Sequence, residues 1–282
     1  MGSDGTGIGR SEHSVLKQKH FAGVVEYLSR VAKRAMEKWE GVDPYYWIFD
    51  MNSARPFYPL QEDDDCGIHL PSSSVIGPKV AARNGHQVRA VLMEIDEGNV
   101  RELYNYYWPR RCSADFFEGR VHVDIHCGDS SELLSNYGRG THASRFGYVY
   151  VDPNVPSIPK TLTEFYAHTC NQKIDLIINI AATSLKRQGL SLEQEIRQVM
   201  AYKRKWLIRE PYGRHQWTML IGTNWVKVND WSAKGFHLLD TEAGRAIFDR
   251  VSKTKQELEA AERGQLEIGG FTQLPTGATP SI

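Results

Sequence analysis

The sequence lacks any long apolar run, and no stretch approaches the ~20 apolar residues that a membrane-spanning helix needs. Its first fourteen residues, MGSDGTGIGRSEHS, also lack the apolar core of a signal peptide. Net charge is absent too, because 34 basic residues balance 34 acidic ones. We therefore expect a soluble, cytoplasmic protein with no membrane partner and no overall field that attracts nucleic acid, although a local basic patch remains possible.

Cysteine is scarce, and the chain lacks the closely spaced cysteine pairs of structural metal sites. The four thiols are widely separated and predict a reducing compartment: Cys66, Cys112, Cys127 and Cys170. His122, Asp124 and His126 alternate along one expected strand, which favours a polar, solvent-facing side over a metal site. No metal is therefore expected.

Glycine-rich phosphate loops and internal repeats are missing as well. The segment Gly5–Gly9 reads GTGIG, but no strand precedes it, so it fails the context of a dinucleotide-binding loop. No repeat of fixed period is visible, which excludes solenoids and propellers.

What the chain does contain is a regular alternation of strand and helix patterns. Five short apolar, β-branched and aromatic runs predict strands: 45–49, 88–95, 121–125, 146–151 and 174–180. Apolar residues at helical spacing predict helices at 14–39, at 74–83 with a start near Pro78, and at 99–107, 131–137, 161–169 and 191–203. Ser14 and Ser191 are expected N-caps, the latter within a capping box.

This alternation predicts an α/β fold, a doubly wound and mostly parallel sheet, with an antiparallel C-terminal hairpin formed by 206–209 and 217–222. We expect a flexible N-terminus at 1–13, one α/β domain at 14–250, and a C-terminal helix and flexible tail at 251–282.

Acidic residues stand where four of the predicted strands end. Asp50, Glu94 (with Asp96) and Asp129 follow the first three strands, and the fourth ends in Asp152-Pro153-Asn154. In open α/β sheets, ligands bind beyond the carboxyl ends of the strands. Each acid alone is explained as a helix cap or turn residue, but the ordered set favours a ligand site.

This order of strand-end acids resembles the class I S-adenosylmethionine-dependent methyltransferases, whose Rossmann-like sheet also ends in a hairpin. The resemblance implies that the loop after the first strand wraps the methionine part of the cofactor. It implies further that acids after the second and third strands meet the ribose hydroxyls and the adenine amine. The cofactor-binding residues are then Asp50, Asn52, Ser53, Glu94, Asp96 and Asp129.

The turn after the fourth strand stands where amino methyltransferases of nucleic acids carry the motif D/N-P-P-Y/F. By this resemblance, Asp152, Pro153 and Asn154 are the catalytic residues that hold a target amine. Asp152-Pro153-Asn154-Val155 lacks the aromatic residue that would stack on a flipped base. Tyr150 and Tyr166 are candidates to replace it.

Three segments resemble the three-Cys-motif partner family of methyltransferase-like proteins: LKQKHFAGVVEYL, KIDLIINIAATSLKR and REPYGRHQWTMLIGTNW. The resemblance covers roughly residues 14 to 226. It implies an association with phages or mobile elements and a companion protein that bears a three-cysteine motif.

The first cofactor motif departs from this family. The family pattern resembles D-x-F-A-G-x-G, whereas this chain has Ala54 and Pro56 in place of the two glycines. Glycine serves there because the backbone approaches the cofactor closely or takes a positive φ, and alanine and proline restrict both.

Basic and aromatic residues are interleaved near the hairpin, a mixture that suits phosphate and base contacts but equally suits charged helix faces and buried tryptophans. The candidate substrate-binding residues are Lys186, Arg187, Arg209, Arg214 and Trp217.

Three functions stay open at this point. The first is an S-adenosylmethionine-dependent methyltransferase acting on an amine of a base in DNA or RNA. The second is a methyltransferase fold that has lost catalysis and serves as a binding or inhibitory partner in a phage or mobile element, which the missing glycines favour. The third is another group transfer on a nucleotide.

Overall fold

The computed structural model describes residues 12–59, 69–110, 119–137, 143–152, 160–187, 190–212, 216–226 and 231–253. The chain forms two compact units, Met1–Pro153 with Pro159–Ile178 and Asn154–Ile158 with Asn179–Ile282, called units 1 and 2 below. Within the described ranges, no helix combines the length and apolar character required to cross a membrane.

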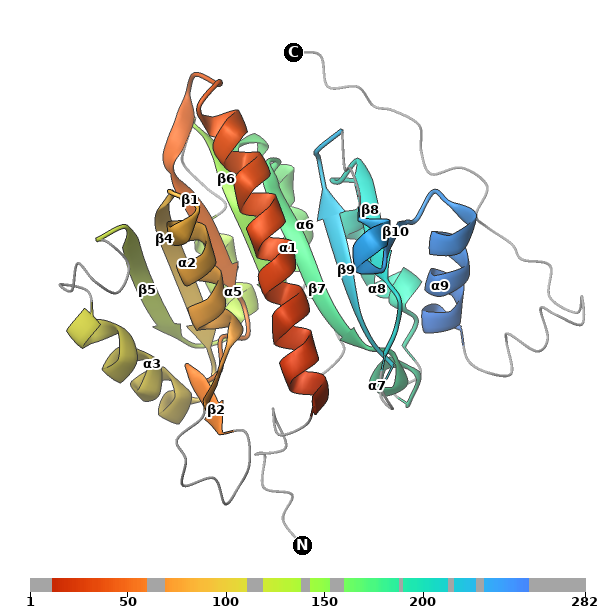
Figure 1. Ribbon diagram of the computed structural model, residues 1–282, viewed down its shortest axis with the longest axis horizontal. Helices are drawn as coiled ribbons and strands as arrows, with labels where there is room; N and C mark the ends of the chain where they lie inside the picture. The colour runs from red at the N-terminus through yellow and green to blue at the C-terminus, as the bar shows by residue number, and fades with distance from the viewer. Residues whose placement is uncertain are drawn as a thin grey trace, which may run out of the picture. The chain divides into compact units, whose positions relative to one another are not determined.

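Unit 1 is built on five parallel strands in the spatial order β7-β6-β1-β4-β5 (Figure 1). Their bounds are β1 Val42–Asp50, β4 Gln87–Glu94, β5 Val121–Cys127, β6 Ser144–Val151 and β7 Ile174–Ala181, the last crossing into unit 2 after Ile178. Counting only these strands along the chain, the order is 3-2-1-4-5, that of a doubly wound Rossmann-type sheet. The fold class predicted from the sequence is confirmed.

Helices cover both faces of these strands (Figure 1). On one face α1 packs against α2 and β6. A side chain of α3 donates a hydrogen bond to a backbone carbonyl of α2. On the other face α5 packs against α6 and β4. The bounds are α1 Glu12–Met36, α2 Ser73–Arg83, α3 Glu97–Arg110, α5 Ser130–Tyr137 and α6 Thr161–Ala167.

The central strands are buried because helices lie over both faces, which explains their nearly continuous apolar runs. The last five residues of β1 and the last seven of β6 are buried. At Gly147 in β6, φ is 151° and an added Cβ would stand 1.8 Å from the Trp47 carbonyl oxygen. Only glycine allows β6 to approach β1 this closely.

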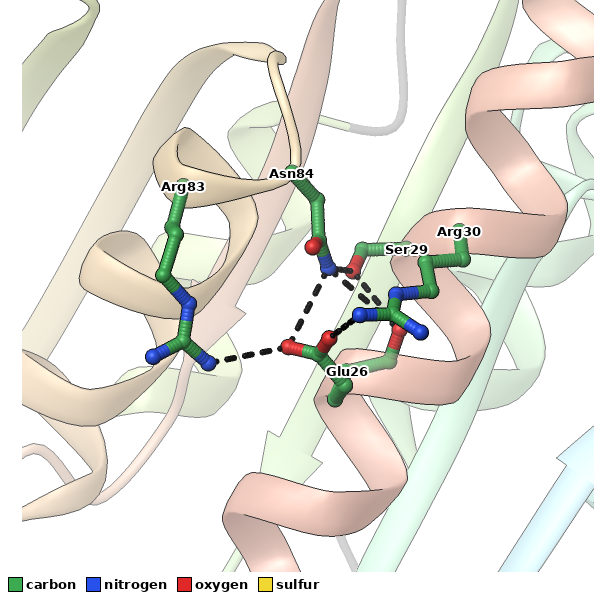
Figure 2. A network of polar contacts seen from close by, with 5 residues as sticks. All are labelled: Glu26, Ser29, Arg30, Arg83 and Asn84. Carbon is green, nitrogen blue, oxygen red and sulfur yellow. Dashed lines mark hydrogen bonds and ion pairs between the residues drawn. The ribbon is translucent and has the colours of Figure 1, made fainter.

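A polar network ties α1 to the end of α2 (Figure 2). The Glu26 carboxylate pairs with Arg30 on its own helix and with Arg83 of α2, at 3.1 Å for the second pair. Asn84 donates to the Ser29 hydroxyl (2.7 Å), and its amide also lies 3.4 Å from Glu26. These contacts link the middle of α1 to the C-terminal end of α2.

Two predicted helix starts are wrong. Ser14 lies inside α1, which begins at Glu12. Helix α2 begins at Ser73 and holds Pro78 in its interior. Proline has no N–H to donate to the carbonyl four residues earlier, here that of Ser74. The Tyr107 hydroxyl of α3 donates to this carbonyl instead (2.5 Å), so a side chain from another helix replaces the missing bond.

A small antiparallel sheet, β2 Phe57–Pro59 with β3 His69–Pro71, lies in the segment between β1 and α2. The five strands predicted from the sequence do not include these two. Antiparallel strands follow β7 in the chain, as the predicted hairpin requires: β8 Lys205–Arg209 pairs with β9 Trp217–Thr223, and β10 Phe236–Leu238 pairs with β8. These strands belong to unit 2.

The helices of unit 2 are α7 Ala182–Arg187, α8 Leu192–Met200 and α9 Glu242–Ser252. Ser191 is the N-cap residue of α8, but its side chain makes no capping hydrogen bond, so the expected capping box is absent. In α9, by contrast, the Thr241 hydroxyl accepts from the Gly244 amide (3.2 Å). Of the predicted flexible N-terminus at 1–13, residues 12 and 13 belong to α1 and residues 1–11 lie outside the described residues. Of the predicted C-terminal helix and tail at 251–282, residues 251 and 252 end α9 and residues 254–282 lie outside the described residues.

Tyr107→Phe will leave the buried Ser74 carbonyl without this donor, and we expect the free energy of unfolding to fall by about 1–3 kcal/mol. In a Pro78→Ala background, residue 78 regains an N–H for the same carbonyl, and the cost of Tyr107→Phe should shrink. Urea denaturation of the four proteins measures this coupling. The control is Tyr104→Phe. It removes the hydroxyl of an exposed tyrosine that donates to the Ile125 carbonyl. Equal costs of Tyr107→Phe in both backgrounds would contradict the compensation.

Candidate active site

The loop after β1 is organised by Asp50, the last residue of that strand. Its side chain is buried, with Oδ1 accepting from the Asn52 amide (3.2 Å) and Oδ2 from the Ser73 hydroxyl at the start of α2 (2.7 Å). Burial raises the pKa of the Asp50 carboxyl to about 7, with smaller contributions from Asp152 and Glu94. The hydrogen bonds from Ser73 and Asn52 oppose this rise. Asp50 therefore joins β1, its loop and α2.

Ser53 is also turned inward. Its hydroxyl donates to the Asp50 carbonyl (3.0 Å), and its amide donates to the carbonyl of Met93 in β4 (3.1 Å). The side chain is fully buried. Of the three expected cofactor residues in this loop, Asn52 has the most accessible side chain, because Asp50 and Ser53 are both buried.

Ala54 adopts the left-handed backbone conformation, with φ of 50°. It stands where the resembling family has its first glycine. Alanine pays a steric cost in this region that glycine does not. The loop therefore takes the glycine-type conformation although the glycine is absent.

Glu94 joins the loops that follow β1 and β4. Its Oε2 accepts from the Ala54 amide (2.7 Å) and its Oε1 from the Asp96 amide (2.9 Å). A carboxylate has about four acceptor positions, so these two bonds leave capacity for ligand hydroxyls. Between the two acids, the Ile95 side chain is 74% exposed and offers an apolar surface beside Glu94, a feature that the sequence reasoning did not single out.

Asp96 and Asp129 act as helix caps. Asp96 Oδ1 accepts from the Asn99 amide at the start of α3 (2.8 Å), and Asp129 Oδ1 accepts from the Ser131 amide at the start of α5 (2.7 Å). Both Asp96 and Asp129 therefore have the role of helix cap, which was the alternative to ligand binding for each acid. Both carboxylates remain at the carboxyl edge of the sheet and both side chains are exposed.

Asp152 is held from three sides after β6. Its amide donates to Asn52 Oδ1 (3.1 Å), and its Oδ2 accepts from the Tyr150 hydroxyl (3.2 Å) and pairs with Lys17 Nζ of α1 (2.5 Å). No role for Lys17 was predicted from the sequence, because helical spacing does not tell which neighbour a helix face meets. Pro153 and Asn154 lie outside the described residues.

Neither proposed replacement for the missing aromatic is placed to stack on a base. The rings of Tyr150 and Tyr166 are both fully buried. The Tyr166 hydroxyl donates to the Asp175 carbonyl (3.0 Å), inside the fold.

The predicted substrate-binding residues belong to unit 2, where they make internal contacts. Lys186 Nζ donates to the Arg250 carbonyl (2.7 Å), and the Arg209 guanidinium lies over the Tyr212 ring at 4.6 Å. Trp217 exchanges backbone hydrogen bonds with Tyr212, both at 2.9 Å. The remaining two residues differ: Arg187 is exposed, and Arg214 lies outside the described residues.

No family model matches the chain, and no curated protein matches it. Solved structures are similar at low identity. Protein LPL1258 from Legionella pneumophila strain Philadelphia 1, described as DUF519, aligns at 14% identity and TM-score 0.48 over 82% of this chain and 94% of that one. The METTL16 methyltransferase domain aligns at 11% identity and TM-score 0.40 over 73% of this chain and 66% of that one. A human methyltransferase 10 domain containing protein aligns at 14% identity and TM-score 0.40 over 74% of this chain and 82% of that one. The strand order, rather than these alignments, carries the assignment of a Rossmann-like fold.

The raised pKa of Asp50 predicts a pH-dependent stability. In the unfolded chain this carboxyl ionises near pH 4, but in the folded protein only near pH 7. Between these values the folded state binds more protons, so the contribution of Asp50 to stability falls as pH rises and then levels off. The amide introduced by Asp50→Asn does not titrate, so the free energy of unfolding of this variant minus that of the parent should increase from pH 4.5 to pH 7. Glu132→Gln, an exposed carboxylate, is the control, and a constant difference would contradict the assignment.

Ala54→Gly should raise the free energy of unfolding by up to about 1 kcal/mol, since the left-handed cost of alanine, ~1–2 kcal/mol, exceeds the entropy that glycine adds to the unfolded chain. Ala32→Gly in the interior of α1 should instead lower it by about 1 kcal/mol. Urea denaturation compares the two. Equal losses at both positions would show that Ala54 is not strained.

Proposed function

We propose that the protein is an S-adenosylmethionine-dependent methyltransferase that modifies an amino group of a base in DNA or RNA. The observation that carries this proposal is the joining of three strand-end loops. Asn52 binds Asp152, and Glu94 binds Ala54, so the loops after β1, β4 and β6 form one hydrogen-bonded edge. In doubly wound sheets, such an edge at the point where strand order reverses is the ligand site.

The residues at this edge fit the cofactor. Glu94 has acceptor capacity for two ribose hydroxyls, and Ile95 presents apolar surface next to it. The loop turn at Ala54 has the backbone conformation for which the family uses glycine. We propose that Glu94, Asp96 and Asp129 hold the adenosine part, and that the loop of Asp50, Asn52 and Ser53 borders the methionine part.

The chemistry supplied by the bound cofactor is transfer of its sulfonium methyl group: the target nitrogen bonds to carbon, sulfur keeps the electron pair of the broken bond, and the nitrogen releases its proton to water. The task of the protein is therefore positioning. The Asp152 carboxylate accepts an N–H of the target and so aims the nitrogen lone pair. Pro153 and Asn154 complete this turn in the proposal.

The nucleic-acid substrate, the phage or mobile-element context and the companion protein with a three-cysteine motif rest on the sequence resemblance and are part of the proposal. Among the substrate-binding candidates in the described part of the chain, the exposed Arg187 has the most accessible charge. Ala54 and Pro56, which stand where the resembling family has glycines, favour a second candidate function: a binding or inhibitory partner without catalysis.

Calorimetric titration with S-adenosylmethionine and S-adenosylhomocysteine separates the two. We expect binding, weakened by about 1–3 kcal/mol in Glu94→Ala because paired hydroxyl contacts are lost. Glu97→Ala, an exposed acid in the first turn of α3, should leave the affinity unchanged. Melting temperatures confirm that each variant is folded. No heat at millimolar ligand with folded protein would reject the methyltransferase and favour the non-catalytic partner.

A further inference from the structure

Lys17 of α1 reaches the turn that follows β6. Its Nζ lies 2.5 Å from Asp152 Oδ2, and the two side chains are only 16% and 20% exposed. A pair this sheltered is screened by salt far less than a surface ion pair. The ammonium is thus a fixed part of the site and not a solvated surface charge.

The packing of α1 explains why Lys17 lies there. Phe21 is one helical turn further along and therefore shares a face with Lys17. The Phe21 ring packs on Tyr150 of β6, with ring centroids 4.4 Å apart. Tyr150 precedes Asp152 by two residues and donates its hydroxyl to the same Oδ2 (3.2 Å). The contact between α1 and β6 thus places the ammonium over the end of the strand.

Asp152 is consequently fixed in position and paired with a positive charge. Asn52 holds its backbone amide, while Tyr150 and Lys17 hold one carboxylate oxygen. A catalytic group fixed by neighbours in this way is positioned before the substrate arrives. The positive charge of Lys17 also balances the negative charge that Asp152 would otherwise present.

We propose that Lys17 is a positioning residue that holds the Asp152 carboxylate in place and balances its charge, so that the site takes a neutral amino group and rejects a protonated alkylamine. This inference rests on the proposed function and names the class of its substrate. A neutral amino group on an aromatic ring or amide donates an N–H to the carboxylate and keeps a nitrogen lone pair. An alkylammonium has no lone pair to attack with.

Electrostatic repulsion by Lys17 also favours a neutral amino group over an alkylammonium. An incoming ammonium would meet the like charge of Lys17 beside a carboxylate that is already paired, and such like-charge contacts are unfavourable. Two other acids of the edge also accept hydrogen bonds from the protein: Asp50 from the Ser73 hydroxyl, and Glu94 from two backbone amides. At the Asp152 carboxylate itself, the selection therefore depends on Lys17.

Lys17→Met removes the charge while keeping most of the side-chain volume, and it tests the proposal without knowledge of the substrate. Ligand-observed NMR titration with n-butylammonium chloride measures affinity for an alkylammonium, and 1-butanol is the uncharged control. We expect Lys17→Met to bind n-butylammonium at least tenfold more tightly than the parent protein, with no change for 1-butanol. The gain should vanish in Lys17→Met/Asp152→Asn, and Lys17→Arg should behave like the parent.

Each result decides the matter. No gain in Lys17→Met, or a gain that survives Asp152→Asn, overturns the inference. If Lys17→Met does not fold, Lys17→Gln takes its place. Titration of the same samples with S-adenosylhomocysteine reports on the proposed function separately. Cofactor binding without an ammonium gain rejects only the role of Lys17, whereas an ammonium gain without cofactor binding keeps the charge balance of Asp152 and rejects methyl transfer.

Discussion

The hydrogen bond from the Asp152 amide to Asn52 Oδ1 joins the ends of β1 and β6, and the candidate site depends on it. These strands are neighbours at the point where the order of the parallel strands reverses. The chain leaves β1 toward β4 and leaves β6 toward β7, so the connections diverge and the edge between them stays open. The Asn52 side chain spans this opening and links Asp152 to the loop of Asp50, although Asn52 and Asp152 are 100 residues apart in the sequence.

The loop after β1 contains a left-handed residue that is not glycine. Ala54 occupies the left-handed region, and its amide is held by Glu94 across the loop. Strained conformations survive where surrounding contacts determine them, and they concentrate at functional sites. The contact with Glu94 holds Ala54 in this conformation.

A second compensation holds the scaffold of the site. Helix α2 starts at Ser73, which binds Asp50, and this start is possible only because Pro78 is tolerated four residues after Ser74. The Tyr107 hydroxyl satisfies the Ser74 carbonyl that the proline leaves open. Local propensity alone would end or delay this helix. A contact from α3 therefore satisfies the carbonyl that Pro78 leaves open, within the helix whose first residue binds Asp50.

The sequence by itself determined the strands, their alternation with helices and the acids at their ends. Burial on both faces of a parallel sheet demands continuous apolar runs, which are visible without a structure. Only the tertiary structure decided the roles of the polar residues. Asp96 and Asp129 cap helices, Ser53 turns inward, and Lys17 meets Asp152. Helical spacing places Lys17 and Phe21 on one face, but the element which that face meets is set by the packing of Phe21 on Tyr150. Such long-range contacts leave no periodic signal in the chain, because they join residues whose separation in sequence is arbitrary.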